Sequence, residues 1–379
     1  MSAEAPRLLF VVTEDWYFVS HRLPLAIAAL RVGYRVAVAT RVKDHAAPIV
    51  EAGVELLELK HWRRSSLNPL RELAAVAELA GVVRRWRPDI VHLVALKPVL
   101  YGGLAARLAG APARVSALAG LGFVFVQGRA LAGLLRPFVK LVFRWTLGGK
   151  RAMTIVQNPD DRDLLIREGL VQAPQVRIIR GSGVDLCRFA AGEPPTGRPI
   201  VMLMSRMLWD KGVGEFVEAA RQATARGADA RFVLVGDPDP ENPAAIPLAK
   251  LREWNESGVV EWWGQRTDAP EVLAQARIVV LPSYREGLPK VLLEAAASGR
   301  PMVATDVPGC REVVEPGVTG LLVRPRDAGE LAEAMLRLIA DPDRCREMGQ
   351  RARRLAEREF GVEAVVARTF DLYRELLGR

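Results

Sequence analysis

Short apolar runs alternate with longer amphipathic stretches along the whole chain, as expected for parallel strands connected by helices. The apolar runs in the first half lie at 8–12, 35–40, 54–59, 90–95, 113–118, 152–157 and 176–180. Those in the second half lie at 199–205, 230–236, 259–263, 276–282, 301–305 and 320–324. The pattern predicts an α/β protein made of two doubly wound, Rossmann-like halves.

A segment rich in Pro and Gly separates the two series of strands, and it lacks hydrophobic periodicity. We take 188–198 as an interdomain linker. The predicted domains are then 1–187 and 199–360, followed by a terminal segment, 361–379. A chain of 379 residues, half of them hydrophobic, is long enough for two separate cores.

A pair of carboxylates follows the strand predicted at 276–282, in the sequence Glu286-Gly-Leu-Pro-Lys-Val-Leu-Leu-Glu294. Open parallel sheets bind ligands beyond the carboxyl ends of their strands. Pro289 suits the first turn of a helix that Gly299 closes, which leaves backbone N–H groups near Leu288 to Val291 available to an anion. This segment therefore predicts an anion site at the start of a helix.

Two cations, Arg206 and Lys211, follow the strand predicted at 199–205. Guanidinium and ammonium groups in this position are suited to neutralising a leaving diphosphate. Each has a plain alternative as a surface cation. Together with Glu286 and the helix start, they predict a site for a diphosphate attached to a sugar.

The two carboxylates and the upstream cations resemble the retaining glycosyltransferases of family 4, which have the GT-B fold. Other segments occur in the family's usual order: Gly181-Ser-Gly-Val-Asp185, Val235-Gly236, Gly264, Thr305-Asp-Val-Pro-Gly309 with Glu312, and Gly317-Val-Thr-Gly-Leu-Leu-Val323. The string Thr13-Glu-Asp-Trp-Tyr-Phe-Val-Ser-His21-Arg22, with Lys97-Pro98, resembles the subgroup that builds bacterial surface polysaccharides on polyprenyl-diphosphate lipids.

The resemblance implies two domains that face each other across a cleft, with the acceptor on the first and the donor on the second. It implies that Glu286 contacts donor-sugar hydroxyls and that Glu294 accepts from the ribose; an ordinary helix carboxylate is the alternative for Glu294. The remaining expected donor contacts are Gly236, Gly287, Leu288, Pro289, Lys290 and Val291. It also implies a last helix that crosses back to the first domain and a site without metal or cofactor.

The acceptor side is expected to involve His21, as a hydrogen-bond partner or proton acceptor, although a helix cap or a packed histidine explains it equally. Trp16 and Tyr17 are candidates for stacking on an acceptor sugar or touching its lipid, against a role in the core. Lys97, at another strand end, is a candidate for the acceptor diphosphate, with a solvated lysine as the alternative.

Positive charge is concentrated in the first half, where residues 1–180 carry 26 Lys and Arg against 14 Asp and Glu. No helix-turn-helix, zinc finger or aromatic RNA motif accompanies it, so we expect no nucleic-acid partner. Arg136, Lys140 and Arg144 recur every four residues in an apolar stretch, which favours an anionic membrane surface. A core helix with a solvated basic edge is the alternative, and no apolar run is long enough to span a bilayer.

Two competing enzyme classes fit the sequence poorly. The turn after the first strand lacks the G-x-G-x-x-G of a Rossmann dehydrogenase. A metal-dependent glycosyltransferase would use an acidic triplet, and Asp237-Pro-Asp239 matches that motif in sequence. We interpret it as a loop feature. Few cysteines and the lack of a signal-peptide pattern predict a reduced, cytoplasmic chain, peripheral on the inner face of the membrane.

We therefore expect a retaining glycosyltransferase that moves a sugar from a nucleotide donor, UDP-linked, to a polyprenyl-diphosphate-linked sugar in surface polysaccharide, O-antigen or glycan assembly. Three alternatives stay open. They are a GT-B enzyme with a soluble acceptor, a GT-B epimerase of nucleotide sugars, and a noncatalytic nucleotide-sugar-binding module.

Overall fold

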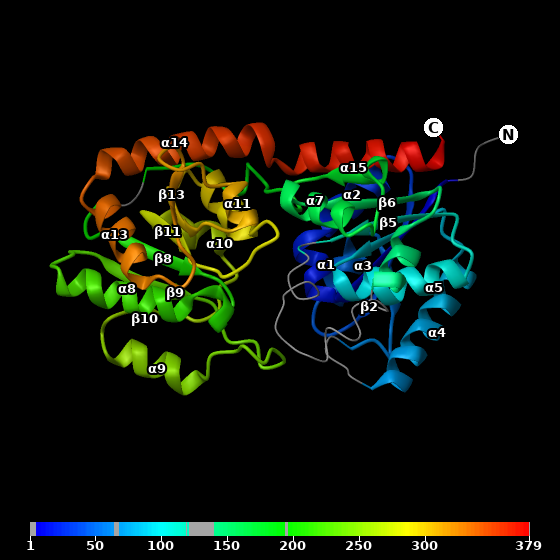
Figure 1. Ribbon diagram of the computed structural model, residues 1–379, viewed down its shortest axis with the longest axis horizontal. Helices are drawn as coiled ribbons and strands as arrows, with labels where there is room; N and C mark the ends of the chain where they lie inside the picture. The colour runs from blue at the N-terminus through cyan, green and yellow to red at the C-terminus, as the bar shows by residue number, and fades with distance from the viewer. Residues whose placement is uncertain (1–4, 64–67, 119, 121–139, 194–195, 379) are drawn as a thin grey trace. The chain divides into compact units, whose positions relative to one another are not determined.

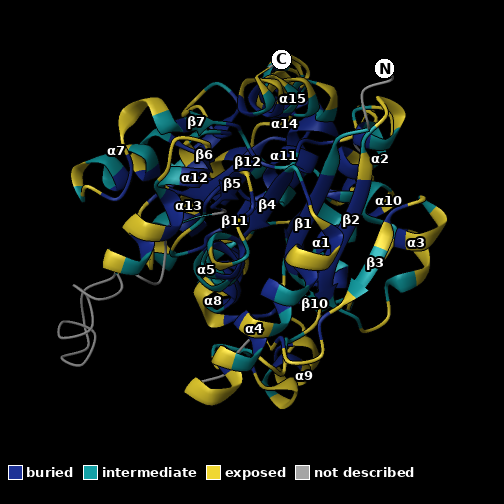
Figure 2. Ribbon diagram, turned by 90° about the vertical axis from the view of Figure 1, so that its right-hand side faces the viewer, coloured by how far each residue is buried: buried dark blue, intermediate teal, exposed yellow. Residues whose placement is uncertain are grey.

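The computed structural model describes residues 5–63, 68–118, 120, 140–193 and 196–378 (Figure 1). The chain divides into two compact units, Met1–Ser182 with Val365–Arg379 and Gly183–Ala364. Each unit is a parallel sheet with helices on both faces. Most strand positions are buried, whereas most exposed residues lie on helices and loops (Figure 2).

The first unit contains a seven-stranded parallel sheet in the order β3-β2-β1-β4-β5-β6-β7. Its strands are β1 (Arg7–Glu14), β2 (Arg35–Arg41), β3 (Glu55–Glu58), β4 (Ile90–Val94), β5 (Ala113–Ala117), β6 (Ala152–Val156) and β7 (Val176–Ile178). Its helices include α1 (Asp15–His21), α2 (Leu23–Arg31), α3 (Ala46–Glu51), α4 (Pro69–Trp86), α5 (Gly103–Leu108) and α7 (Pro159–Arg167), with a π-helical turn at Pro98–Gly102. Strands β4, β5 and β6 are buried at every position, because helices cover both faces of the sheet.

The second unit contains a six-stranded parallel sheet in the order β10-β9-β8-β11-β12-β13. Its strands are β8 (Ile200–Met204), β9 (Arg231–Val235), β10 (Glu261–Trp262), β11 (Ile278–Leu281), β12 (Met302–Thr305) and β13 (Gly320–Val323). The helices are α8 (Val213–Ala225), α9 (Leu248–Glu256), α10 (Ala269–Gln275), α11 (Lys290–Ala297), α12 (Pro308–Arg311), α13 (Ala328–Ile339) and α14 (Pro342–Glu359), with a 3₁₀ turn at Trp209–Lys211.

Each strand predicted from an apolar run is present, with its ends shifted by only a few residues. The strand order reverses beside β1 in the first sheet and beside β8 in the second. Such switch points open a crevice beyond the carboxyl ends of the central strands. The segments after β1, β8 and β11 therefore occupy the positions where ligands bind in doubly wound sheets.

The last helix, α15 (Val362–Leu377), supplies core residues to the first unit. Tyr373 is fully buried, and its hydroxyl lies 2.5 Å from Nδ1 of His92 on β4. Burial lowers the pKa of His92 well below its usual value, and the nearby Arg22 lowers it further. The helix is thus tied to the centre of this sheet by apolar packing and by one buried polar contact.

Candidate active site

The segment after β11 and the turn after β8 meet through an ion pair. Lys211 Nζ donates to Glu286 Oε1 at 2.5 Å, across 75 residues of sequence. The two side chains are 22% and 10% exposed, respectively. The structure therefore brings together one of the two predicted cations and the first of the two predicted carboxylates.

Two glycines allow the backbone to approach closely at this edge of the sheet. Gly212 has a φ of +71°, and a Cβ there would stand 2.1 Å from the carbonyl oxygen of Pro282 at the end of β11. Gly236, one of the predicted donor contacts, has a φ of +130°, and its Cβ would stand 1.9 Å from the carbonyl oxygen of Ser205. Any side chain at either position would push the loops apart.

Helix α11 begins beside the ion pair, one residue later than the sequence predicts. Pro289 is the N-cap, with φ −74° and ψ 119°, rather than part of the first turn. The ring fixes φ, but ψ is extended, so the helix starts at Lys290. The first N–H groups of a helix have no partner within the helix, and those of α11 begin here. Leu288 is only 8% exposed, so its side chain belongs to the core.

The second predicted carboxylate, Glu294, lies one turn into α11. Its side chain is 8% exposed and 3.1 Å from Nζ of Lys290. Burial raises the pKa of Glu294, whereas Lys290 and Arg188 oppose that shift. A buried carboxylate gains from hydrogen-bond donors, so Glu294 differs from an ordinary solvated helix carboxylate.

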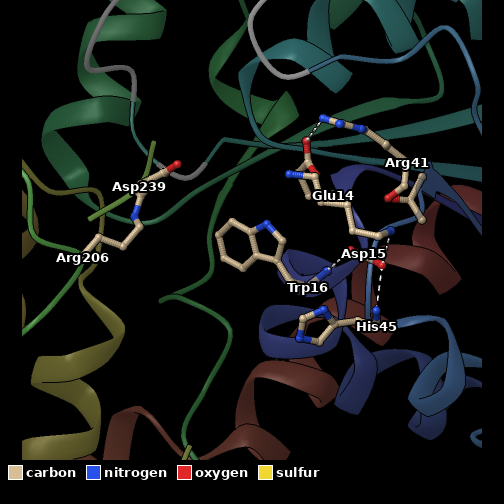
Figure 3. A network of polar contacts seen from close by, with 9 residues as sticks. Glu14, Asp15, Trp16, Arg41, His45, Arg206 and Asp239 are labelled. Atoms are coloured by element: carbon tan, nitrogen blue, oxygen red, sulfur yellow. Dashed lines mark hydrogen bonds and ion pairs between the residues drawn. The ribbon is translucent and has the colours of Figure 1, made fainter. Parts of the chain in front are cut away.

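The other predicted cation, Arg206, pairs with a different carboxylate. Its Nη1 lies 2.6 Å from Oδ2 of Asp239, and the two side chains are 42% and 13% exposed (Figure 3). Asp239 belongs to the acidic triplet after β9, so an arginine neutralises one member of that triplet. Across the described parts of the chain, no group of three or more His, Cys, Asp or Glu residues is arranged to hold a metal.

Sequence reasoning missed Tyr284, which follows β11 directly. Its hydroxyl donates to Oε1 of Glu215 on α8 at 2.5 Å, and the Arg326 guanidinium lies 4.5 Å from its ring centroid. Burial and the contact with Glu215 raise the pKa of Tyr284 to about 12. Its backbone N–H donates to the carbonyl of Asp210 at 3.0 Å, so the residue braces the strand end that carries Glu286.

In the first unit, two acidic residues organise the turn after β1, and the sequence analysis did not select either. Asp15 is fully buried, and its Oδ2 accepts from the backbone N–H groups of Lys43 at 2.7 Å and His45 at 2.9 Å (Figure 3). Glu14 is 2% exposed and lies 3.4 Å from Arg41. These contacts join the start of α1 to the loop after β2.

The three predicted acceptor residues of α1 form one aromatic row. The rings of Tyr17 and His21 stack at 4.1 Å with an angle of 5° between their planes. Trp16 meets Tyr17 edge to face at 5.5 Å. All three are partly exposed, whereas the neighbouring Phe18 is fully buried in the core. The structure thus groups Trp16, Tyr17 and His21, and their acceptor roles stay predictions.

Lys97 makes an internal contact. Its Nζ lies 2.8 Å from Glu72 on α4 and 2.5 Å from the carbonyl of Arg63, and its side chain is 15% exposed. The Trp62 and Tyr101 rings lie 5.6 and 5.4 Å from the ammonium. A solvated lysine is not what the structure shows, and the predicted contact with an acceptor diphosphate stays a prediction.

Of the basic stripe, Arg136 lies outside the described residues. Lys140 and Arg144 lie in a helical stretch, 140–147, where Lys140 pairs with Glu168. Leu141 and Trp145 in the same stretch are 63% and 40% exposed. Among the described helices, none has the length and apolar character needed to cross a membrane.

Family models match both halves of the chain. The model "Glycosyl transferase 4-like" matches residues 7–157, and "Glycosyl transferases group 1" matches residues 198–341. A Campylobacter jejuni protein, N,N'-diacetylbacillosaminyl-diphospho-undecaprenol alpha-1,3-N-acetylgalactosaminyltransferase, is 32% identical over 293 residues, which cover 74% of this chain and 75% of that protein. The chain belongs to glycosyltransferase family 4.

This glycosyltransferase is also similar to an Escherichia coli protein, UDP-Gal:alpha-D-GlcNAc-diphosphoundecaprenol alpha-1,3-galactosyltransferase, at 27% identity over 82% of each chain. Among solved structures, sucrose-phosphate synthase from Thermosynechococcus elongatus matches with a TM-score of 0.79 at 22% identity, covering 98% of this chain and 99% of that one. HepE of Anabaena, in complex with UDP and glucose, matches with a TM-score of 0.76 at 19% identity, covering 96% and 98%. These likenesses confirm the predicted GT-B fold.

Proposed function

We propose that this glycosyltransferase moves a sugar, with retention, from a UDP-linked donor to a polyprenyl-diphosphate-linked sugar in surface polysaccharide or glycan assembly. By their names, the Campylobacter jejuni and Escherichia coli relatives act on sugars carried by diphosphoundecaprenol. The HepE structure contains UDP. The single observation in this chain that carries the proposal is the ion pair of Lys211 and Glu286 beside the start of α11.

The donor half of the reaction uses charges that are already in place. Negative charge grows on the diphosphate as its bond to the sugar breaks, and Lys211 and Arg206 stabilise that charge. The N-terminal end of α11 adds backbone N–H groups and a favourable dipole. Glu286 accepts hydrogen bonds from the sugar hydroxyls, and its contact with Lys211 fixes its position.

The buried carboxylate of Glu294 accepts hydrogen bonds from the ribose hydroxyls of the nucleotide. The ribose hydroxyls donate to the carboxylate oxygens of Glu294, which burial has removed from water. Gly236, Gly287, Val291 and the backbone around Pro289 and Leu288 contact the rest of the donor. The site works without a metal, because cations of the protein itself neutralise the diphosphate.

The acceptor half is formed by Trp16 and Tyr17, which stack on the acceptor sugar, and by His21, which hydrogen-bonds its attacking hydroxyl. Lys97 meets the acceptor diphosphate only if it leaves Glu72. The enzyme lies on the inner face of the cytoplasmic membrane, where Arg136, Lys140 and Arg144 face anionic lipid. Each such cation contributes roughly 1 kcal/mol near an anionic leaflet.

The test is mass spectrometry of the products formed from a panel of nucleotide sugars and membrane-extracted polyprenyl-diphosphate glycans. We expect a lipid-linked product heavier by one sugar with the wild-type protein and with Glu256→Gln, an exposed glutamate at the end of α9. Glu286→Gln should give no such product while remaining folded. Transfer to a soluble sugar at a comparable rate would refute the proposed acceptor. Full activity of Glu286→Gln would refute the proposed site.

A further inference from the structure

A pocket rich in arginine lies in the second unit at the edge opposite the donor residues. It has a volume of about 310 Å³, and its lining includes Glu193 and five arginines, Arg277, Arg300, Arg346, Arg353 and Arg354. Arg277 immediately precedes β11, and Arg300 lies two residues before the start of β12. They therefore sit at the amino ends of these strands, whereas Glu286 follows the carboxyl end of β11. The pocket is a separate site from the donor crevice.

Helix α14 packs on α11 (Figure 1). Residues of α14 and of the turn that follows α11 line the pocket. Helix α14 begins at Asp341, whose side chain accepts from the N–H of Arg344, with Pro342 at the first helical position. A Cβ at Gly349 would stand 2.1 Å from the carbonyl oxygen of Gly299, so α14 lies directly on the turn that ends α11. The pocket is thus held by a rigid contact between two helices.

Arg300 is the residue of this pocket that most directly indicates a ligand. Its side chain is 1% exposed, and Nη2 donates to the carbonyl of Ala274 at 3.0 Å. Its Nε and Nη1 have no hydrogen-bond partner within the part of the chain that the structure describes. A buried charged group with unmet donors is destabilising unless an anion or water completes it. Among the described residues Arg300 therefore forms no ion pair, although Glu193 attracts it electrostatically.

The charge of the lining is strongly unbalanced, with five arginines against one glutamate. The guanidinium of Arg353 already has hydrogen-bond partners, because it donates to the carbonyl oxygens of Leu186, Phe189 and Ala297. The single acid, Glu193, lies 3.5 Å from Arg346. Arg277 and Arg354 form no ion pair with another residue of the described chain. Within the described residues, the arginines of the lining that form no ion pair are Arg277, Arg300 and Arg354.

We propose that this pocket binds a soluble small molecule that carries a phosphate or diphosphate group. Guanidinium groups match phosphate oxygens in geometry and in charge, and they bind them with paired hydrogen bonds. The volume is that of a small-molecule site, and the concave shape does not suit a flat lipid surface. A ligand here contacts the turn after α11, the helix that carries Lys290 and Glu294.

The test is isothermal titration of the full-length protein with inorganic pyrophosphate at constant ionic strength, in a Lys211→Met background that weakens the donor site. We expect saturable binding that Arg277→Gln weakens about tenfold or more, as for a lost hydrogen bond to a charged group. Arg277→Lys should restore part of it, and Arg252→Gln, on the exposed side of α9, should leave it unchanged. Arg300→Met is the second variant and should weaken binding similarly if it folds.

Two results would overturn the proposal. The first is the absence of pyrophosphate binding in the Lys211→Met background, or binding that neither Arg277→Gln nor Arg300→Met weakens. The second is sedimentation with phosphatidylglycerol vesicles that depends on Arg277, without any binding of free pyrophosphate, because the phosphate group would then belong to a lipid surface. Equal vesicle binding by Arg277→Gln and wild type supports a soluble ligand.

Discussion

Removing the ammonium of Lys211 should weaken both the fold and the reaction, and the structure sets the size of each effect. Exposed ion pairs contribute about 0–1 kcal/mol, whereas breaking a fully buried pair costs about 3–5 kcal/mol. Lys211 and Glu286 are 22% and 10% exposed, and their charged atoms are 2.5 Å apart. The pair lies between these limits, so Lys211→Met should lower the free energy of unfolding by about 2–3 kcal/mol.

A double-mutant cycle separates this pair from the other contacts of its members. Lys211→Met and Glu286→Gln should together cost less stability than the sum of the single changes, by about 1–2 kcal/mol, because neither charge is then left alone. Urea unfolding followed by circular dichroism gives the four free energies. The exposed pair of Arg226 and Glu333 in the same unit, 51% and 59% exposed, is the matched control and should show a clearly smaller coupling, because solvent screens it.

Steady-state transfer kinetics test the second role of the same residue. A lost electrostatic contact to developing charge typically lowers kcat by about 10²–10³-fold, and we expect this loss for Lys211→Met. The reasoning fails if the coupling of Lys211 with Glu286 is no larger than that of the exposed control pair. It also fails if Lys211→Met keeps the wild-type kcat/KM, because the leaving diphosphate would then be neutralised by other groups.

Three further predictions concern single residues. Gly212→Ala should lower the free energy of unfolding in urea by about 2 kcal/mol or more, since its methyl group would meet the backbone of β11, and an unchanged midpoint would contradict this close approach. The pKa of His92 is depressed in the folded protein, so the unfolded chain binds more protons below pH about 6.5, and stability should fall as the pH decreases from there. His92→Gln should flatten that dependence, and Tyr373→Phe should not. Asp239→Asn should reduce the rate of sugar transfer less than Arg206→Met does, and the reaction of this variant should be insensitive to EDTA. If added Mn²⁺ restored activity lost in Asp239→Asn, Asp239 would instead be a metal ligand.

The strands and the position of the site follow from local sequence features. A parallel strand with both faces covered is a continuous apolar run, and β4, β5 and β11 stand out for this reason. Residues that follow such runs fall at the carboxyl edge of the sheet, which is why Glu286 and Lys211 can be selected from the sequence alone. Which of them touch is a matter of loop geometry, because the two residues are 75 positions apart.

What the sequence does not predict are polar contacts between distant segments. Asp15 binds the backbone N–H groups of a loop 28 and 30 residues away, and no local pattern indicates a buried aspartate there. Tyr284 and Glu215 are 69 residues apart, and each looks ordinary in its own segment. Lys97 reads as a free cation at a strand end because its partner, Glu72, lies on another helix. The periodicity of hydrophobic residues indicates which positions are buried, but it does not indicate which polar side chains contact one another.

Arg206 and Lys211 look equivalent in the sequence, but their surroundings differ, and the difference predicts separate roles in the proposed donor site. Lys211 is mostly buried and held by Glu286, so its field is weakly screened and its position is fixed before a donor arrives. Arg206 is 42% exposed and held by Asp239, so it keeps access to solvent and to a mobile ligand. A fixed, poorly solvated cation acts most on charge that develops during the reaction, because it needs no reorganisation. An exposed, paired arginine acts more on binding of the intact diphosphate, which exists before the bond breaks. If the proposed site is correct, we therefore expect Lys211→Met to lower kcat more than donor affinity, and Arg206→Met to lower donor affinity more than kcat.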